Sequence, residues 1–161
     1  MEGWTDFYVA AVGGAAALAG LLVVAVSINI VKIMSFPLLP GRAAQTILTI
    51  GGALVIASLG LFPAQSILVF GGETFVISLV ILGTGLRQFR AAILRRESGD
   101  PITWTLLPVA MDVVTQAPTF VGSILLIAGH DAGFYWIGAG IILSFISALE
   151  NGWVLLVEIL R

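Results

Sequence analysis

The chain has 161 residues, of which 59% are hydrophobic and 10% are charged, with a formal net charge of -2 and no cysteine. This composition lies far outside that of soluble domains and indicates an integral membrane protein. The lack of cysteine excludes disulfides and thiolate metal sites. The lack of any soluble module argues against nucleic-acid binding.

Apolar runs long enough to cross a membrane occur five times in the chain. A hydrocarbon core of about 30 Å needs roughly 20 apolar residues in a helix. Counted between Gly, Pro and polar breaks, the predicted helices cover about residues 6–34, 43–62, 66–96, 103–128 and 134–160. The sequence therefore predicts an all-α, polytopic membrane bundle. Residues 1–161 form one transmembrane domain in this interpretation, with no soluble domain.

The first predicted helix is rich in small residues. Gly13 and Ala17 have the small-xxx-small spacing that lets a neighbouring helix backbone approach closely, and Gly20 extends the same series. We therefore expect Gly13, Ala17 and Gly20 to pack against another helix. The far end of this helix carries Asn29, an amide inside an otherwise apolar run.

The third predicted helix continues into a basic segment that contains Arg87, Arg90, Arg95 and Arg96. Two interpretations of this segment are open. Basic residues set the orientation of membrane proteins by staying on the cytoplasmic side. They also bind anionic lipid headgroups or an acidic cytoplasmic partner.

The basic residues sort cleanly by side of the membrane. With the N-terminus outside, the inner segments hold all seven of them, and the outer segments hold none. These residues are Lys32, Arg42, Arg87, Arg90, Arg95, Arg96 and Arg161. The positive-inside rule therefore predicts five crossings with the N-terminus outside and the C-terminus inside.

The fourth predicted helix carries a polar stripe that must face protein or water. Asp112, Thr115, Gln116 and Thr119 fall on or near one face at helical spacing, and Ser123 continues it outward. Ionisable groups within lipid are costly and are by default candidates for function. We therefore expect this helix to be central in the bundle.

A second carboxylate lies at the same predicted depth. Asp112 and Glu150 each lie roughly 6 to 7 Å to the inner side of their helix centres, at about 1.5 Å per residue. Asn151 shares that level, and Asn29 and Arg87 lie slightly further inward. The functional interpretation is a hydrated site that binds a cation or passes a proton. In the structural interpretation, Arg87 pairs with a carboxylate and interhelical hydrogen bonds satisfy the other groups.

Catalytic patterns are missing from the sequence. The one histidine, His130, lies in a predicted outer loop far from Asp112 and Glu150, so neither a histidine–carboxylate metal site nor a serine–histidine pair is expected. No metalloprotease, phosphate-loop or dinucleotide motif occurs. We therefore expect no enzyme activity, no cofactor and no metal.

The two ends of the chain carry a resemblance. Residues 6–10 (DFYVA), 13–21 (GGAAALAGL), 27–29 (SIN) and 151–159 (NGWVLLVEI) resemble a group of small bacterial integral membrane proteins. Some of these carry the name "modulator of FtsH protease", after a membrane-anchored ATP-dependent protease. The resemblance implies a bacterial inner-membrane protein and adds a regulatory role to the hypotheses.

Three hypotheses of function follow from the sequence. The first is a homo-oligomeric, channel-like or transport protein that passes a cation or proton by way of Asp112 and Glu150. The second is a non-catalytic regulator or scaffold of a membrane partner. The third is a binder of lipid or of a hydrophobic small molecule.

Overall fold

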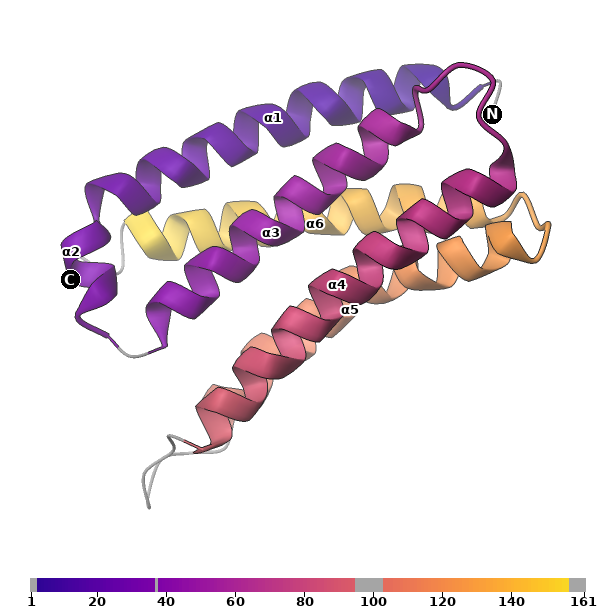
Figure 1. Ribbon diagram of the computed structural model, residues 1–161. Helices are drawn as coiled ribbons and strands as arrows, with labels where there is room; N and C mark the ends of the chain where they lie inside the picture. The colour runs from indigo at the N-terminus through magenta and orange to yellow at the C-terminus, as the bar shows by residue number, and fades with distance from the viewer. Residues whose placement is uncertain (1–2, 37, 95–102, 157–161) are drawn as a thin grey trace.

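The computed structural model describes residues 3–36, 38–94 and 103–156, and for residues 103–109 and 155 it describes the backbone alone. Within these ranges the chain is helical and contains no strand. The helices are α1 (Thr5–Ile28), α2 (Ile30–Met34), α3 (Leu39–Leu59), α4 (Ile67–Leu94), α5 (Thr103–Ile127) and α6 (Gly133–Leu156) (Figure 1).

Five of the described helices are long and apolar enough to cross a membrane. They are α1, α3, α4, the part of α5 from Ala110 onward, and α6. The predicted all-helical fold with five transmembrane helices is therefore confirmed, and the chain is a multi-pass membrane protein.

The first predicted helix is divided at Asn29. The residue leaves helical geometry, with φ of -103° and ψ of 13°, and α2 begins directly after it. Its backbone N–H still reaches the Ala25 carbonyl at 3.3 Å, and its own carbonyl accepts from the Ile33 N–H at 2.9 Å. The side chain of Asn competes with helical hydrogen bonding, which explains a local bend at this position.

The helices form two groups that meet along α3 and α6. Helices α1, α3 and α6 pack against one another, and the hairpin of α4 and α5 joins them through contacts of α4 with α3 and of α5 with α6. Towards the end where α4 stops and α5 begins, this hairpin diverges from the other helices (Figure 1). Lys32, Arg42, Arg87 and Arg90 lie on elements that end or begin on that side, which we call the basic end.

Glycines bring α5 and α6 into backbone contact. A Cβ atom on Gly133 would clash with the Gly122 carbonyl oxygen, and one on Gly122 would lie 2.7 Å from the Gly133 carbonyl oxygen. About two helical turns after Gly133 on α6, Gly140 leaves room for the Thr119 side chain. Small residues allow such close approach, which strengthens van der Waals packing in lipid.

Aromatic rings close the end opposite the basic end. Tyr8 and Phe70 are fully buried there, and their ring centroids are 5.8 Å apart. Phe134 stacks on Phe70 at 6.1 Å and on Trp4 at 5.8 Å. Rings from α1, α4 and α6, together with Trp4 just before α1, thus form one continuous apolar cluster.

Candidate functional site: a polar cavity at the basic end

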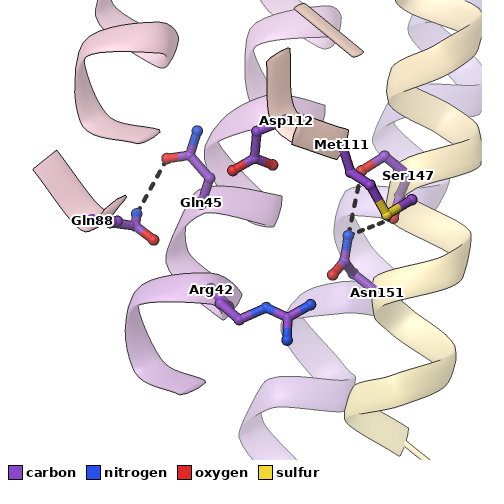
Figure 2. Close-up of a pocket in the computed structure, with 7 residues that line it drawn as sticks. All are labelled: Arg42, Gln45, Gln88, Met111, Asp112, Ser147 and Asn151. Atoms are coloured by element: carbon purple, nitrogen blue, oxygen red, sulfur yellow. Dashed lines mark hydrogen bonds between the residues drawn. The ribbon is translucent and has the colours of Figure 1, made fainter. Parts of the chain in front are cut away.

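A small polar cavity lies between four helices at the basic end. It has about 40 Å³ of free space. The lining side chains come from α3, α4, α5 and α6 and are Arg42, Gln45, Gln88, Met111, Asp112, Ser147 and Asn151 (Figure 2). Arg42 and Met111 are exposed, so the cavity reaches the surface.

A second cavity adjoins the first and extends towards the middle of the bundle. It has about 60 Å³ of free space and is lined by residues of α3, α4 and α5. Asp112 and Gln45 line both cavities, and Gln116 lines the second one. A buried water needs about 10–15 Å³ of such free space and several polar partners. The first cavity offers both, with room for a few waters, whereas the second is lined mostly by apolar side chains.

Gln45 organises the α3–α4 side of the site. Its Nε2 donates to the Ile81 carbonyl at 3.1 Å, and its Oε1 accepts from the Thr84 hydroxyl at 2.9 Å and from Gln88 Nε2 at 3.2 Å. The side chain is 4% exposed. A buried amide with these partners holds α3 and α4 in one register, because an unsatisfied amide in this environment is costly.

Asp112 has a different environment from Gln45. Its side chain is half-buried, and none of the described residues donates a hydrogen bond to its carboxylate or lies within ion-pair distance of it. In Figure 2 the carboxylate turns towards Gln45, while the Arg42 guanidinium reaches across the far side of the cavity towards Asn151. The carboxylate is therefore available to water or to a bound ion.

Gly85 makes room for the Gln45 amide beside Asp112. A Cβ atom at this position would lie 3.3 Å from Gln45 Nε2 and 3.8 Å from the Asp112 Oδ2 atom. Gly85 is buried on α4 and lines the second cavity. Its missing side chain thus allows the amide and the carboxylate to lie against the α4 backbone.

Arg87 is not the charge partner expected from the sequence. It is exposed and lines neither cavity. Two helical positions separate it from Gly85, which turns it by about 200° to the other side of α4. The basic residue that lines the cavity with Asp112 is Arg42, which the sequence interpretation used only for topology.

Glu150 also lies apart from Asp112. It is exposed, whereas its neighbour Asn151 lines the first cavity. Adjacent residues on a helix point about 100° apart, so only one of the two faces inward. The Asn151 amide bonds within α6 to the Ser147 carbonyl at 2.8 Å and to the Ser147 hydroxyl at 3.3 Å.

The polar stripe of α5 is buried, as a central helix requires. Thr115, Gln116, Thr119 and Ser123 are each 6% exposed or less. The Thr115 hydroxyl donates to the Met111 carbonyl at 2.8 Å, and Ser123 donates to the Phe120 carbonyl at 2.7 Å. Thr119 is pressed against Gly140 of α6, and the α5 residues that line the two cavities extend no further than Gln116.

The remaining predicted residues lie outside these cavities. Asn29 is buried at the junction of α1 and α2, where it interacts within the protein. Arg90 is exposed on α4, and Arg95 and Arg96 fall outside the described residues. Gly13, Ala17 and Gly20 face outward from α1, with open space where a Cβ atom of either glycine would lie. They do not pack against another helix of this chain.

Gln45 and Gln88 are the functional candidates that sequence reasoning missed. A signal existed, because Gln45 is the one amide side chain in the predominantly apolar α3 span. The described residues contain no group of three His, Cys, Asp or Glu side chains placed to hold a metal ion.

Comparison with protein-family models, with curated proteins and with solved structures finds no match for this chain.

Proposed function

We propose that this protein passes protons across a membrane without catalysing a reaction, with Asp112 as the group that takes up and releases the proton. The observation that carries this proposal is a half-buried carboxylate without a hydrogen-bond partner among the described residues, where a small polar cavity meets a second, mostly apolar one. Intramembrane carboxylates facing a water-filled cavity are typical of proton pathways.

The charges in the cavity favour a proton over a metal cation. Arg42 lines the same cavity as Asp112, so the two charges balance and little net negative charge remains there to hold a metal cation. A proton differs from a metal cation because it forms a covalent bond with a carboxylate oxygen. A proton that binds Asp112 needs no further space, and a few waters can carry it to the surface at Arg42. The small free volume of the cavities also argues against an organic solute as the transported species.

Membrane and orientation belong to the same proposal. The basic end faces the cytoplasm if the positive-inside rule holds, and the cavity then opens inward. The resemblance of the chain ends to small bacterial membrane proteins supports placement in the bacterial inner membrane. In the conformation described, the Thr119–Gly140 contact and the aromatic cluster close the outer half.

Proton flux into liposomes tests the proposal. Purified protein is reconstituted with a pH-sensitive dye inside the vesicles, and a potassium diffusion potential drives proton entry. We expect Asp112→Asn to lower the flux at least tenfold. Glu150→Gln is the matched control, because Glu150 is exposed and lines neither cavity. A wild-type protein without flux, or equal losses in both variants, would refute the proposal.

A second candidate function is association with another membrane helix through α1. Gly13, Ala17 and Gly20 form an outward-facing series with open space over both glycines. Small residues of this kind let two helices approach closely. We propose that a second copy of the chain packs here, or a membrane partner such as the ATP-dependent protease that the resemblance suggests.

Disulfide cross-linking tests whether a second copy of the chain packs on this face of α1. The chain has no cysteine, so Gly20→Cys introduces a single thiol, and Gly83→Cys on the exposed face of α4 is the control. A second copy on α1 gives a covalent dimer from Gly20→Cys but not from Gly83→Cys. Equal cross-linking of both variants contradicts a dimer through α1.

A further inference from the structure

An apolar groove runs between α3 and α4 on the outer surface of the bundle. It has about 410 Å³ of free space. All of its lining residues are aliphatic or glycine, namely Ile47, Leu48, Gly51, Gly52, Val55, Val76, Ile77, Val80 and Ile81. Gly51 forms part of its floor, and a Cβ atom there would meet no atom within 4 Å. No side chain of the described residues therefore fills the space above Gly51.

The dimensions of the groove match one acyl chain. From Ile47 to Val55 the helix rises about 12 Å, and half of a hydrocarbon core is about 15 Å. A methylene group is close in size to a water molecule of about 30 Å³, so 410 Å³ holds about a dozen of them. The groove also lies along α3 and α4, which both cross the membrane.

Charges at the two ends of the groove select the direction of the lipid. Arg87 follows Val80 by seven residues, which places it on the same face of α4 about 10 Å towards the basic end. It is exposed and forms no hydrogen bond or ion pair with the described residues. Glu73 lies seven residues before Val80, towards the opposite end, where it accepts a hydrogen bond from Gln65. An anionic headgroup is attracted at the first position and repelled at the second.

We infer that the groove binds the acyl chain of one anionic phospholipid whose phosphate lies at Arg87. The bound chain covers Ile81, which lines both the groove and the second polar cavity. Ile81 is thus the wall between the lipid and the cavity that contains Asp112. An acyl chain held against it keeps this wall in place.

Native mass spectrometry of the full chain, titrated with lipid, tests the inference. The probes are dioleoyl phosphatidylglycerol and dioleoyl phosphatidylcholine, which share acyl chains and differ in headgroup charge. We expect Arg87→Gln to weaken binding of the anionic lipid about fivefold, as removal of one basic contact predicts, with no change for the zwitterionic lipid. Arg90→Gln is the charge control, because Arg90 is turned further from the groove, and its effect should stay below twofold.

A second pair of variants blocks the groove itself. Gly51→Leu fills the free space, and Gly72→Leu adds the same side chain at an equally open position on α4 outside the groove. We expect the first variant to lose one bound lipid of either headgroup and the second to lose none. If Gly51→Leu fails to fold by circular dichroism, Val80→Phe fills the groove from α4, with Val24→Phe on α1 as its control.

Three outcomes would overturn the inference. One is unchanged lipid binding in the groove-filling variant that folds, and another is unchanged binding of the anionic lipid in Arg87→Gln. The third is a wild-type dimer in lipid-free detergent that Gly51→Leu converts to a monomer, which would show that a second copy of the chain occupies the groove.

Discussion

Substitution of Gly122 by Ala tests whether backbone contact between α5 and α6 holds the bundle together. The added Cβ atom would lie 2.7 Å from the Gly133 carbonyl oxygen and 2.8 Å from the Ile137 backbone nitrogen. Both are backbone atoms, so no side chain can rotate away. To reach an ordinary contact of 3.4 Å, the helices must separate by about 0.7 Å at this point.

The expected cost follows from two opposing terms. Overpacking of a close contact costs about 1–3 kcal/mol, whereas Ala in place of Gly stabilises a helix by about 0.5–1 kcal/mol. We therefore expect Gly122→Ala to lower the free energy of unfolding by about 1–2 kcal/mol. Gly83→Ala is the control at an open, exposed position on α4, and only the helix term applies there, so it should raise the free energy by about 0.5–1 kcal/mol.

Equilibrium unfolding in bicelles, followed by steric trapping or by denaturing detergent, measures both variants against the wild type. The two variants differ only in what surrounds the new methyl group. We therefore expect the free energy of unfolding to fall in Gly122→Ala and to rise in the control variant. Equal stabilisation by Gly122→Ala and Gly83→Ala would refute the close contact between α5 and α6.

Three further substitutions follow from the hydrogen bonds and the cavities. Gln45→Leu removes the bonds to Ile81, Thr84 and Gln88 and should cost about 1–2 kcal/mol, since single interhelical bonds in membranes average about 0.6 kcal/mol; the same unfolding assay measures it, and no loss would show that these bonds do not hold α3 to α4. Tyr8→Phe removes a buried hydroxyl with no hydrogen-bond partner among the described residues, so stability should stay equal or rise by up to about 1 kcal/mol; a clear loss in thermal melting would contradict this. Gly85→Val puts bulk beside Asp112 Oδ2 and should reduce proton flux in liposomes at least threefold; unchanged flux would contradict passage at that point.

The number and approximate bounds of the membrane-spanning helices could be predicted from the sequence, because both depend on the length of apolar runs. The thickness of the bilayer requires about 20 apolar residues for each crossing. The sequence has five such runs, and the described residues form five matching helices. The predicted burial of the α5 stripe also follows from chemistry, since the amide of Gln116 and the hydroxyls near it are costly in lipid. All four predicted uncharged stripe residues are buried.

The rotation of each helix about its axis could not be predicted in the same way. In a soluble protein the apolar face shows which side is buried, but lipid and protein interior are equally apolar. Helix α1 illustrates this, because it buries Ala11 and Ala15 and exposes Gly13 and Ala17. On α6, a rotation of the helix by one residue decides whether Glu150 or Asn151 faces the cavity. On α4, a rotation by two residues decides whether Arg87 or Gly85 faces it. Both errors about the site have this single cause.

The α5 helix has its weakest point beside its close contact with α6. Pro118 lacks a backbone N–H and leaves the Val114 carbonyl without its usual helical partner. The next residue, Thr119, contacts Gly140 on α6, and the α5 residues that line the two cavities extend no further than Gln116. A helix bends most readily at proline, and a bend at Pro118 would move Thr119 relative to α6. We therefore place at Pro118 the conformational change that a proton pathway through the outer half of the bundle needs.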